Sequence, residues 1–242
     1  ILSDDTEITE HIITDVNISI DTGDGYESVE KGDIIRVVEP YNEFKVKIRY
    51  DFSLPNDHGY KNGATYTIQL PEMLTIQNNL QPRPLLDETG IQFASFIVED
   101  NKVIITFNEK IEEKNNISGY IEGESEFAAH YDGAADTKLT FPIEGGATVE
   151  YPVKFIKKGS SISKKGEGNK GYNTEIITWT VDFNKDFQEI ENAILTDEIT
   201  EGDHEFVAGS LKVYELELNA DGTILNTTEV HGFGDSFPLS LG

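Results

Sequence analysis

Short stretches in which apolar and polar residues alternate recur along almost the whole chain. A period of two is the pattern of a β-strand with one buried face, and these stretches are rich in β-branched and aromatic residues. The clearest are 16–20, 44–50, 65–70, 102–107 and 138–141, separated by turns rich in Gly, Asn and Asp. Helical signals are limited to 89–96 and 187–193, which are long enough for single turns only. The pattern therefore predicts an all-β protein made of β-sandwiches rather than an α/β fold.

A second series of strand-like stretches begins near Tyr151. It comprises 153–156, 176–183, 193–197 and 209–216, followed by a hairpin signal at 219–222. We therefore place a domain boundary near Pro152, which gives domains 1–152 and 153–242 with almost no linker between them. The second series supplies about five strands, whereas a complete sandwich has seven or more. The second domain is therefore expected to be incomplete at its C-terminal end.

The charge balance excludes several classes of partner. The 242 residues include 45 Asp and Glu against 19 Lys and Arg, a formal charge of −26, so nucleic acid and anionic membrane surfaces are disfavoured. No apolar run approaches the 18 residues of a membrane-spanning helix. There is no cysteine, and the five histidines lie in no metal-binding or catalytic spacing. We therefore expect no enzymatic activity, no metal site and no cofactor.

The charge is unevenly distributed along the chain. Residues 1–150 carry a net charge of −18 and residues 151–242 a net charge of −8, yet six lysines crowd into 154–170 with only Glu167 opposing them. Such a segment forms either a positive rim that attracts an acidic partner or a solvated loop. The ligand-binding candidates from this region are Lys158, Lys164, Lys165, Lys170 and Tyr172.

Lys157 and Asp197 form a second candidate pair. Alternation in an early strand would point one lysine of Lys157-Lys158 into the sandwich, and Asp197 follows the apolar run 193–196. A buried, unpaired charge shifts toward its neutral form. A neutral amine is a nucleophile, and a protonated carboxyl can polarise an amide, so the pair has the ingredients of a Lys–Asn isopeptide cross-link. A solvated strand end and a turn are the alternatives for these two residues.

Several strings resemble a known family in order along the chain. FIKKG (155–159), ITWTVDFN (177–184), AILTDEI (193–199) and GSLKVYEL (209–216) are similar to the ligand-binding region of collagen-binding Gram-positive surface adhesins, the MSCRAMM family. YDFSLP (50–55), NGATYTIQLPEMLTI (62–76) and ITFNEKIEEKNNISGYIEGESEF (105–127) are similar to the domain that precedes it. The chain departs from the family at Ile156, where an aromatic residue is common, and between Lys157 and Trp179, where a longer, lysine-rich stretch is typical of an inserted loop. We expect Trp179 itself to pack in the core.

The resemblance implies two immunoglobulin-like β-sandwich domains in tandem, exported and anchored to the cell wall of a Gram-positive bacterium. The implied partner is an extracellular-matrix protein such as collagen, held in a trench between the domains. Within the family, the lysine matching Lys157 bonds to an asparagine on a late strand, and the aspartate matching Asp197 promotes the reaction. The asparagine is expected beyond Gly242. A stalk or pilin-like module without its own ligand is the alternative function, and strand exchange with another copy is a further expectation for an incomplete domain.

Overall fold

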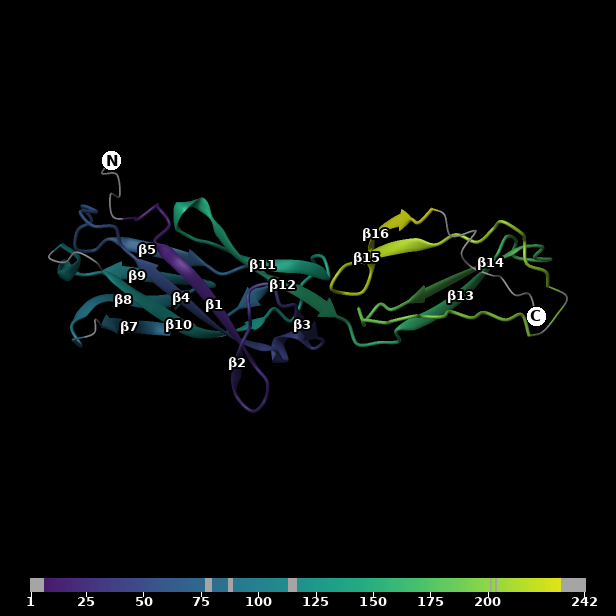
Figure 1. Cartoon of the computed structure of the whole chain (residues 1–242), viewed down its shortest axis with the longest axis horizontal. Coiled ribbons are helices and arrows are strands. Elements are labelled where there is room, and N and C mark those ends of the chain that lie inside the picture. The colour runs from purple at the N-terminus through teal and green to yellow at the C-terminus, as the bar shows by residue number, and fades with distance from the viewer. Residues whose placement is uncertain are drawn as a thin grey trace. The chain divides into compact units, whose positions relative to one another are not determined.

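The computed structural model describes residues 7–76, 80–86, 89–112, 117–200, 202 and 204–231 (Figure 1). Internal contacts divide the chain into a first unit, Ile1–Tyr131 with Thr137–Phe155, and a second unit, Asp132–Asp136 with Ile156–Gly242. Regular structure in the described residues is β-strand apart from short 3-10 turns, which confirms the predicted all-β class. No helix among them is long and apolar enough to cross a membrane.

Strands β1 to β12 belong to the first unit. They are β1 (Ile13–Asp21), β2 (Tyr26–Ser28), β3 (Ile35–Val38), β4 (Lys45–Ser53), β5 (Thr65–Gln69), β6 (Leu74–Thr75), β7 (Leu80–Leu86), β8 (Gln92–Glu99), β9 (Lys102–Phe107), β10 (Ser118–Phe127), β11 (Asp136–Pro142) and β12 (Thr148–Ile156). The 3-10 turns are η1 (Tyr41–Glu43), η2 (Glu109–Glu112) and η3 (Glu144–Gly146).

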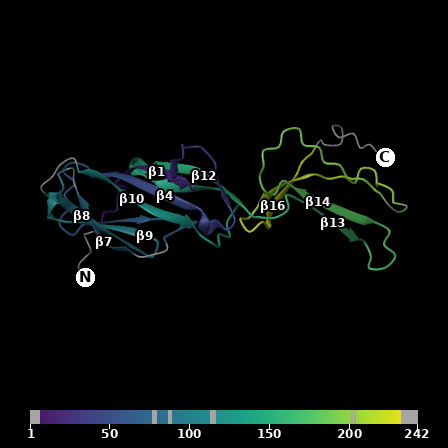
Figure 2. The same ribbon diagram turned by 90° about the horizontal axis from the view of Figure 1, so that it is seen from below.

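The strands of the first unit form three sheets, and several of these strands are labelled in Figure 2. The sheet β2-β1-β4-β10-β6 lies on one side, and the sheets β5-β9-β8-β7 and β11-β12-β3 lie on the other. Aromatic pairs join the layers: Phe52 on β4 lies 6.2 Å from Phe93 on β8, and Tyr50 on β4 lies 5.9 Å from Phe141 on β11, both measured between ring centroids. The core therefore sits between β4 and both opposing sheets.

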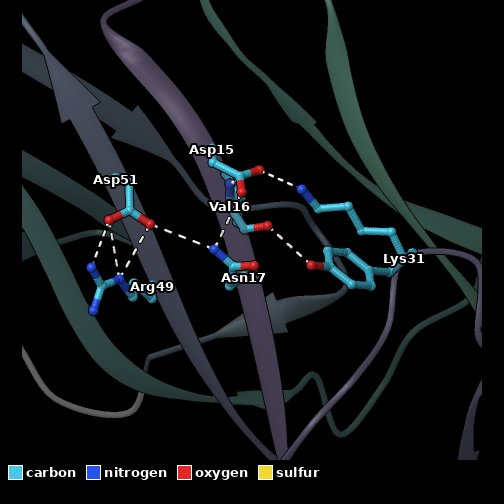
Figure 3. A network of polar contacts seen from close by, with 7 residues as sticks. Asp15, Val16, Asn17, Lys31, Arg49 and Asp51 are labelled. Atoms are coloured by element: carbon cyan, nitrogen blue, oxygen red, sulfur yellow. Dashed lines mark hydrogen bonds and ion pairs between the residues drawn. The ribbon is translucent and has the colours of Figure 1, made fainter.

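Strand β4 shows how the alternating sequence builds this layer. Val46, Ile48, Tyr50 and Phe52 are buried, whereas the residues between them face outward. Arg49 and Asp51 form a bidentate pair on the outer face, and Lys31 pairs with Asp15 on neighbouring β1 at 2.5 Å (Figure 3). The period of two thus separates an apolar inner face from a charged outer face.

The second unit holds two short two-stranded sheets. Strand β13 (Ile162–Gly168) pairs with β14 (Ile177–Phe183), and β15 (Tyr214–Leu218) pairs with β16 (Ile224–Glu229) around the predicted hairpin turn. Residues 132–136 belong to this unit because Ala134 bridges to Asn219 and the N–H of Ala135 donates to the carbonyl of Leu218 at 2.7 Å. Residues 193–197 and 209–213 were predicted as strand and are not, since neither segment has a β partner among the described residues.

The division between the units falls between Phe155 and Ile156, whereas the sequence placed a boundary at Pro152. Strand β12 runs on past Pro152 because its last residues are still anchored in the first unit. Phe155 is buried there, with its ring centroid 5.0 Å from that of Tyr41 and 5.5 Å from that of Phe127.

Candidate functional site

Strands β13 and β14 form an amphipathic ribbon in the second unit. The register places Lys164 opposite Val181 and Gly166 opposite Trp179. Because side chains alternate along a strand, one face carries Ile162, Lys164, Gly166, Gly168, Ile177, Trp179, Val181 and Phe183. The segment interpreted from sequence as an inserted loop therefore contains a paired strand, and its two central lysines, Lys164 and Lys165, lie on opposite faces.

Lys164 is the centre of a charged cluster on the apolar face. Its Nζ lies 2.6 Å from Oδ1 of Asp197 and 4.4 Å from the centroid of the Trp179 ring. The indole covers Gly166, where a Cβ atom would come within 2.6 Å of the ring. A side chain at this position would displace the indole from where it lies. The cluster thus holds an ammonium group between a carboxylate and an aromatic ring.

Lys157 lies outside this cluster. Its side chain passes the turn between β15 and β16, where its Cδ would be 3.1 Å from a Cβ built on Gly222. Hydrogen bonds from the hydroxyl and N–H of Thr223 lower the pKa of Asp221, and attraction to Lys157 lowers it further. The burial expected for Lys157 and Asp197 is wrong, since both are exposed. Strand β12 ends at Ile156, so the alternation that would have turned a lysine inward does not extend to Lys157.

The remaining lysine candidates are largely neutralised by neighbouring carboxylates. Lys165 bonds to Glu167, and this hydrogen bond raises the pKa of Lys165. Lys170 pairs with Glu175, with 2.7 Å between Nζ and Oε1. Lys158 is exposed and has no ion pair with any residue that the structure describes. The local positive charge is therefore smaller than the run of lysines in the sequence suggests.

Tyr172 is presented at the tip of the loop between β13 and β14. Its side chain is 92% exposed. The loop below it is closed by the N–H of Asn169, which donates to the carbonyl of Ile176 at 2.9 Å, and by the Thr174 hydroxyl, which donates to the carbonyl of Lys170 at 2.8 Å. An exposed aromatic ring on a hydrogen-bonded loop is well suited to contact a partner, because little further ordering is needed on binding.

Trp179 is not a core residue in the described structure. Its side chain is 56% exposed, and Phe183 on the same face is half exposed. The prediction of core packing assumed further strands opposite the ribbon, and among the described residues none covers this face.

The described residues contain no group of three or more His, Asp or Glu placed to hold a metal ion. The acidic segment 21–25 instead closes as a turn, in which the N–H of Gly23 donates to Oδ1 of Asp21 and the N–H of Thr22 donates to the carbonyl of Gly25, both at 2.9 Å. Its oxygen atoms are therefore used within the turn.

Comparison with known proteins identifies both parts of the chain. Residues 39–131 match the family model of a bacterial Ig domain, and residues 159–236 match that of a collagen binding domain. The chain is therefore similar to a bacterial Ig domain over its first part and to a collagen binding domain over its second. The Ig domain lies within the first unit, which confirms the Ig-like sandwich predicted there. The matched collagen binding domain includes β13 to β16 together with the Lys164 cluster.

Solved structures from Gram-positive surface proteins show the same kind of similarity. The collagen binding domain of surface protein RspB from Erysipelothrix rhusiopathiae is 16% identical, with 74% of this chain and 57% of that chain covered and a TM-score of 0.40. The collagen adhesin from S. aureus is 18% identical, with 68% and 49% covered and a TM-score of 0.42. The chain thus spans about half the length of these structures. A comparison with curated proteins found no match.

The sequence contains two Lys-Lys-Gly strings, and of their first lysines only Lys164 contacts Asp197. The string interpreted first begins at Lys157, whereas the second begins at Lys164 and lies on β13. The collagen binding domain match starts at residue 159, so it includes Lys164 and Asp197 and leaves Lys157 outside. The second Lys-Lys-Gly string is the signal in the sequence that could have identified Lys164. Its glycine, Gly166, pairs with Trp179 on the alternating strand β14.

Proposed function

We propose that this chain is part of a non-enzymatic surface adhesin that binds collagen. The observation that carries the proposal is the match of residues 159–236 to the collagen binding domain family. Following the resemblance, we place the protein outside the cell, anchored to the cell wall of a Gram-positive bacterium. We also propose that collagen is held by the two domains together, so a segment limited to 156–242 is expected to bind more weakly than the whole chain.

Tyr172 is our leading candidate for a contact with collagen. Collagen is a triple helix of extended, proline-rich chains, and it offers mainly ring edges and backbone carbonyls at its surface. A tyrosine ring packs against such rings, and its hydroxyl donates to carbonyls, which is why tyrosine is enriched among the residues that dominate binding energy. The lysines of this region contribute less, because Lys164, Lys165 and Lys170 are each paired with a carboxylate.

The test measures binding of the 242-residue chain to immobilised triple-helical collagen, with fibrinogen and fibronectin as comparison ligands. We expect Tyr172→Ala to weaken collagen binding about 10-fold, the loss of one hot-spot side chain. Tyr120→Ala is the matched control, because Tyr120 is an exposed tyrosine of the Ig domain. No binding to collagen by the unsubstituted chain would refute the proposal, and equal losses in both variants would refute the role of Tyr172.

The Lys164 cluster favours a second candidate function, a mechanically stable stalk module. We propose that Lys164, rather than Lys157, is the lysine of an isopeptide bond. Its Nζ would attack Cγ of an asparagine side chain, a C–N amide bond would form, and the asparagine nitrogen would leave as ammonia while Asp197 carries the proton. The 2.6 Å distance between Lys164 and Asp197 supports this assignment. The asparagine is expected beyond Gly242.

Intact-mass measurement on a longer chain that extends past Gly242 tests the cross-link. Formation of the bond lowers the mass by about 17 Da, the mass of one ammonia. Lys164→Ala is expected to abolish the mass loss, and Lys157→Ala is expected to leave it in place. The reverse pattern would return the role to Lys157. An unchanged mass in the unsubstituted chain would exclude the bond, and collagen binding by that same chain would separate an adhesin from a stalk.

A further inference from the structure

The first unit contains a pocket of about 370 Å³ that plays no part in the proposals above. It lies where the chain before β1 passes between β4, β5 and β11. Four consecutive residues of β5, Tyr66 to Gln69, contribute to its wall, together with Tyr50 from β4 and Phe141 from β11. Its volume falls within the range of sites that bind small molecules, roughly 300–1,000 Å³.

The pocket has an apolar floor and a polar rim. The buried residues Ile8, Ile13 and Ile68 form the floor with Phe141. Exposed polar residues, including Thr9 and His11, form the rim. An apolar floor with a few polar groups is the usual composition of a site that orients a small ligand.

Two tyrosines line this pocket, and their hydroxyl groups differ. Burial raises the pKa of Tyr66, and the nearby backbone N–H of Ile12 opposes that rise, so the Tyr66 hydroxyl has a polar neighbour. The Tyr50 hydroxyl has no hydrogen-bond partner among the described residues, although Tyr50 is only 5% exposed. A buried hydrogen-bond donor without a partner is unfavourable. A ligand that brings an acceptor to this hydroxyl would therefore form a hydrogen bond with it without breaking an existing one.

We infer that this pocket binds a small uncharged molecule that presents an apolar ring and an oxygen acceptor. The ring packs on Ile8, Ile13 and Ile68, and the oxygen accepts a hydrogen bond from Tyr50. Among the buried side chains that line this pocket, Tyr50 is the one in the described residues whose polar atom is unpaired, so an oxygen acceptor is the group that completes its hydrogen bonding. Rotamer changes on binding are common, so the acceptor can reach a hydroxyl that the walls shield from water.

N-acetylpyrrolidine is a suitable probe, because it combines a five-membered ring with a tertiary amide carbonyl and has no N–H. It is titrated into the 242-residue chain carrying ¹³C-labelled isoleucine methyl groups. We expect chemical-shift changes at Ile8, Ile13 and Ile68 with a dissociation constant on the order of millimolar, as for other fragments of this size. Tyr50→Phe is expected to weaken binding about 2- to 10-fold, the effect of one neutral hydrogen bond.

Tyr66→Phe is the matched control, since it removes the other tyrosine hydroxyl of the same pocket, which lies near the backbone N–H of Ile12. Binding to this variant is expected to stay within about twofold of the unsubstituted chain. Absence of shifts at the three isoleucines would overturn the site. Unchanged binding by Tyr50→Phe, or equal weakening by both variants, would overturn the role of the Tyr50 hydroxyl. These outcomes are independent of collagen binding, which is measured separately.

Discussion

Replacement of Tyr50 by phenylalanine is expected to stabilise the first unit. The side chain is buried on β4, and its hydroxyl has no hydrogen-bond partner among the described residues. Folding therefore strips this hydroxyl of water without replacing the lost hydrogen bonds, at a cost of about 1–3 kcal/mol. Phenylalanine keeps the ring that packs 5.9 Å from Phe141 and removes that cost. Allowing for the small void left by the oxygen, we expect a gain of about 1 kcal/mol.

Tyr151→Phe is the matched control, with an effect of opposite sign. Tyr151 is fully buried, but its hydroxyl donates to the carbonyl of Val16 on β1 at 3.0 Å. Its removal leaves that carbonyl unpaired and is expected to cost about 1–2 kcal/mol. A pair of variants that differ by one oxygen atom each should therefore move stability in opposite directions.

Urea unfolding followed by circular dichroism measures both effects. The one tryptophan, Trp179, lies in the second unit, so its fluorescence identifies the unfolding of that unit and separates it from the transition of the first. A gain of about 1 kcal/mol corresponds to a rise in melting temperature of about 2–4 °C. If Tyr50→Phe destabilised the first unit as much as Tyr151→Phe, the Tyr50 hydroxyl would have a native partner, and the reasoning would be refuted.

Three further predictions follow from single contacts. Burial raises the pKa of Tyr50 above its ordinary value of 10.0, so the unfolded chain loses this proton first. The contribution of Tyr50 to stability is complete below pH 10 and falls by about 1.4 kcal/mol per pH unit above it, so Tyr50→Phe should reduce the dependence of stability on pH by this amount in urea titrations at each pH. Gly166→Ala places a methyl group 2.6 Å from the Trp179 ring, so it should shift the tryptophan emission and lower the free energy of unfolding by about 1–3 kcal/mol. Gly171→Ala is the control and should change neither, because no atom lies within 4 Å of a Cβ built there. The ion pair of Lys164 is partly exposed, so a double-mutant cycle with Asp197 should give a coupling of less than about 1 kcal/mol, and a larger value would show a pair shielded from water.

The strands that could be predicted from sequence are those with one clearly buried face. The stretch 102–107 coincides with β9, because its alternating residues Val103, Ile105 and Phe107 all enter the core. The single turn predicted at 89–96 was wrong, since residues 92–96 belong to β8. This strand carries neighbouring buried residues, Phe93 and Ala94, so its pattern does not alternate cleanly. Local periodicity identifies a strand only when its two faces meet different environments.

The candidate site was harder to predict because it depends on pairing between distant segments. Whether a lysine meets Asp197 is decided by the register of β13 on β14 and by the path of the chain after residue 184. Neither the register nor the path of the chain can be read from a string of five residues, and the two Lys-Lys-Gly strings are equivalent locally. No pattern in the sequence indicates that the Tyr50 hydroxyl is unpaired, because this depends on the absence of hydrogen-bond acceptors among the residues around it in the fold.

The chemistry of Lys164 depends on what covers the apolar face of the ribbon. On an exposed face, an ammonium 2.6 Å from a carboxylate stays charged and acts as an ordinary ion pair. Burial of the same pair under an apolar layer would penalise both charges, and transfer of the proton from Lys164 to Asp197 would yield a neutral amine and a carboxylic acid. These are the two forms that isopeptide formation requires. Packing against Trp179 and reactivity at Lys164 are therefore coupled, and a variant that leaves this face uncovered should retain the ion pair and lose the cross-link.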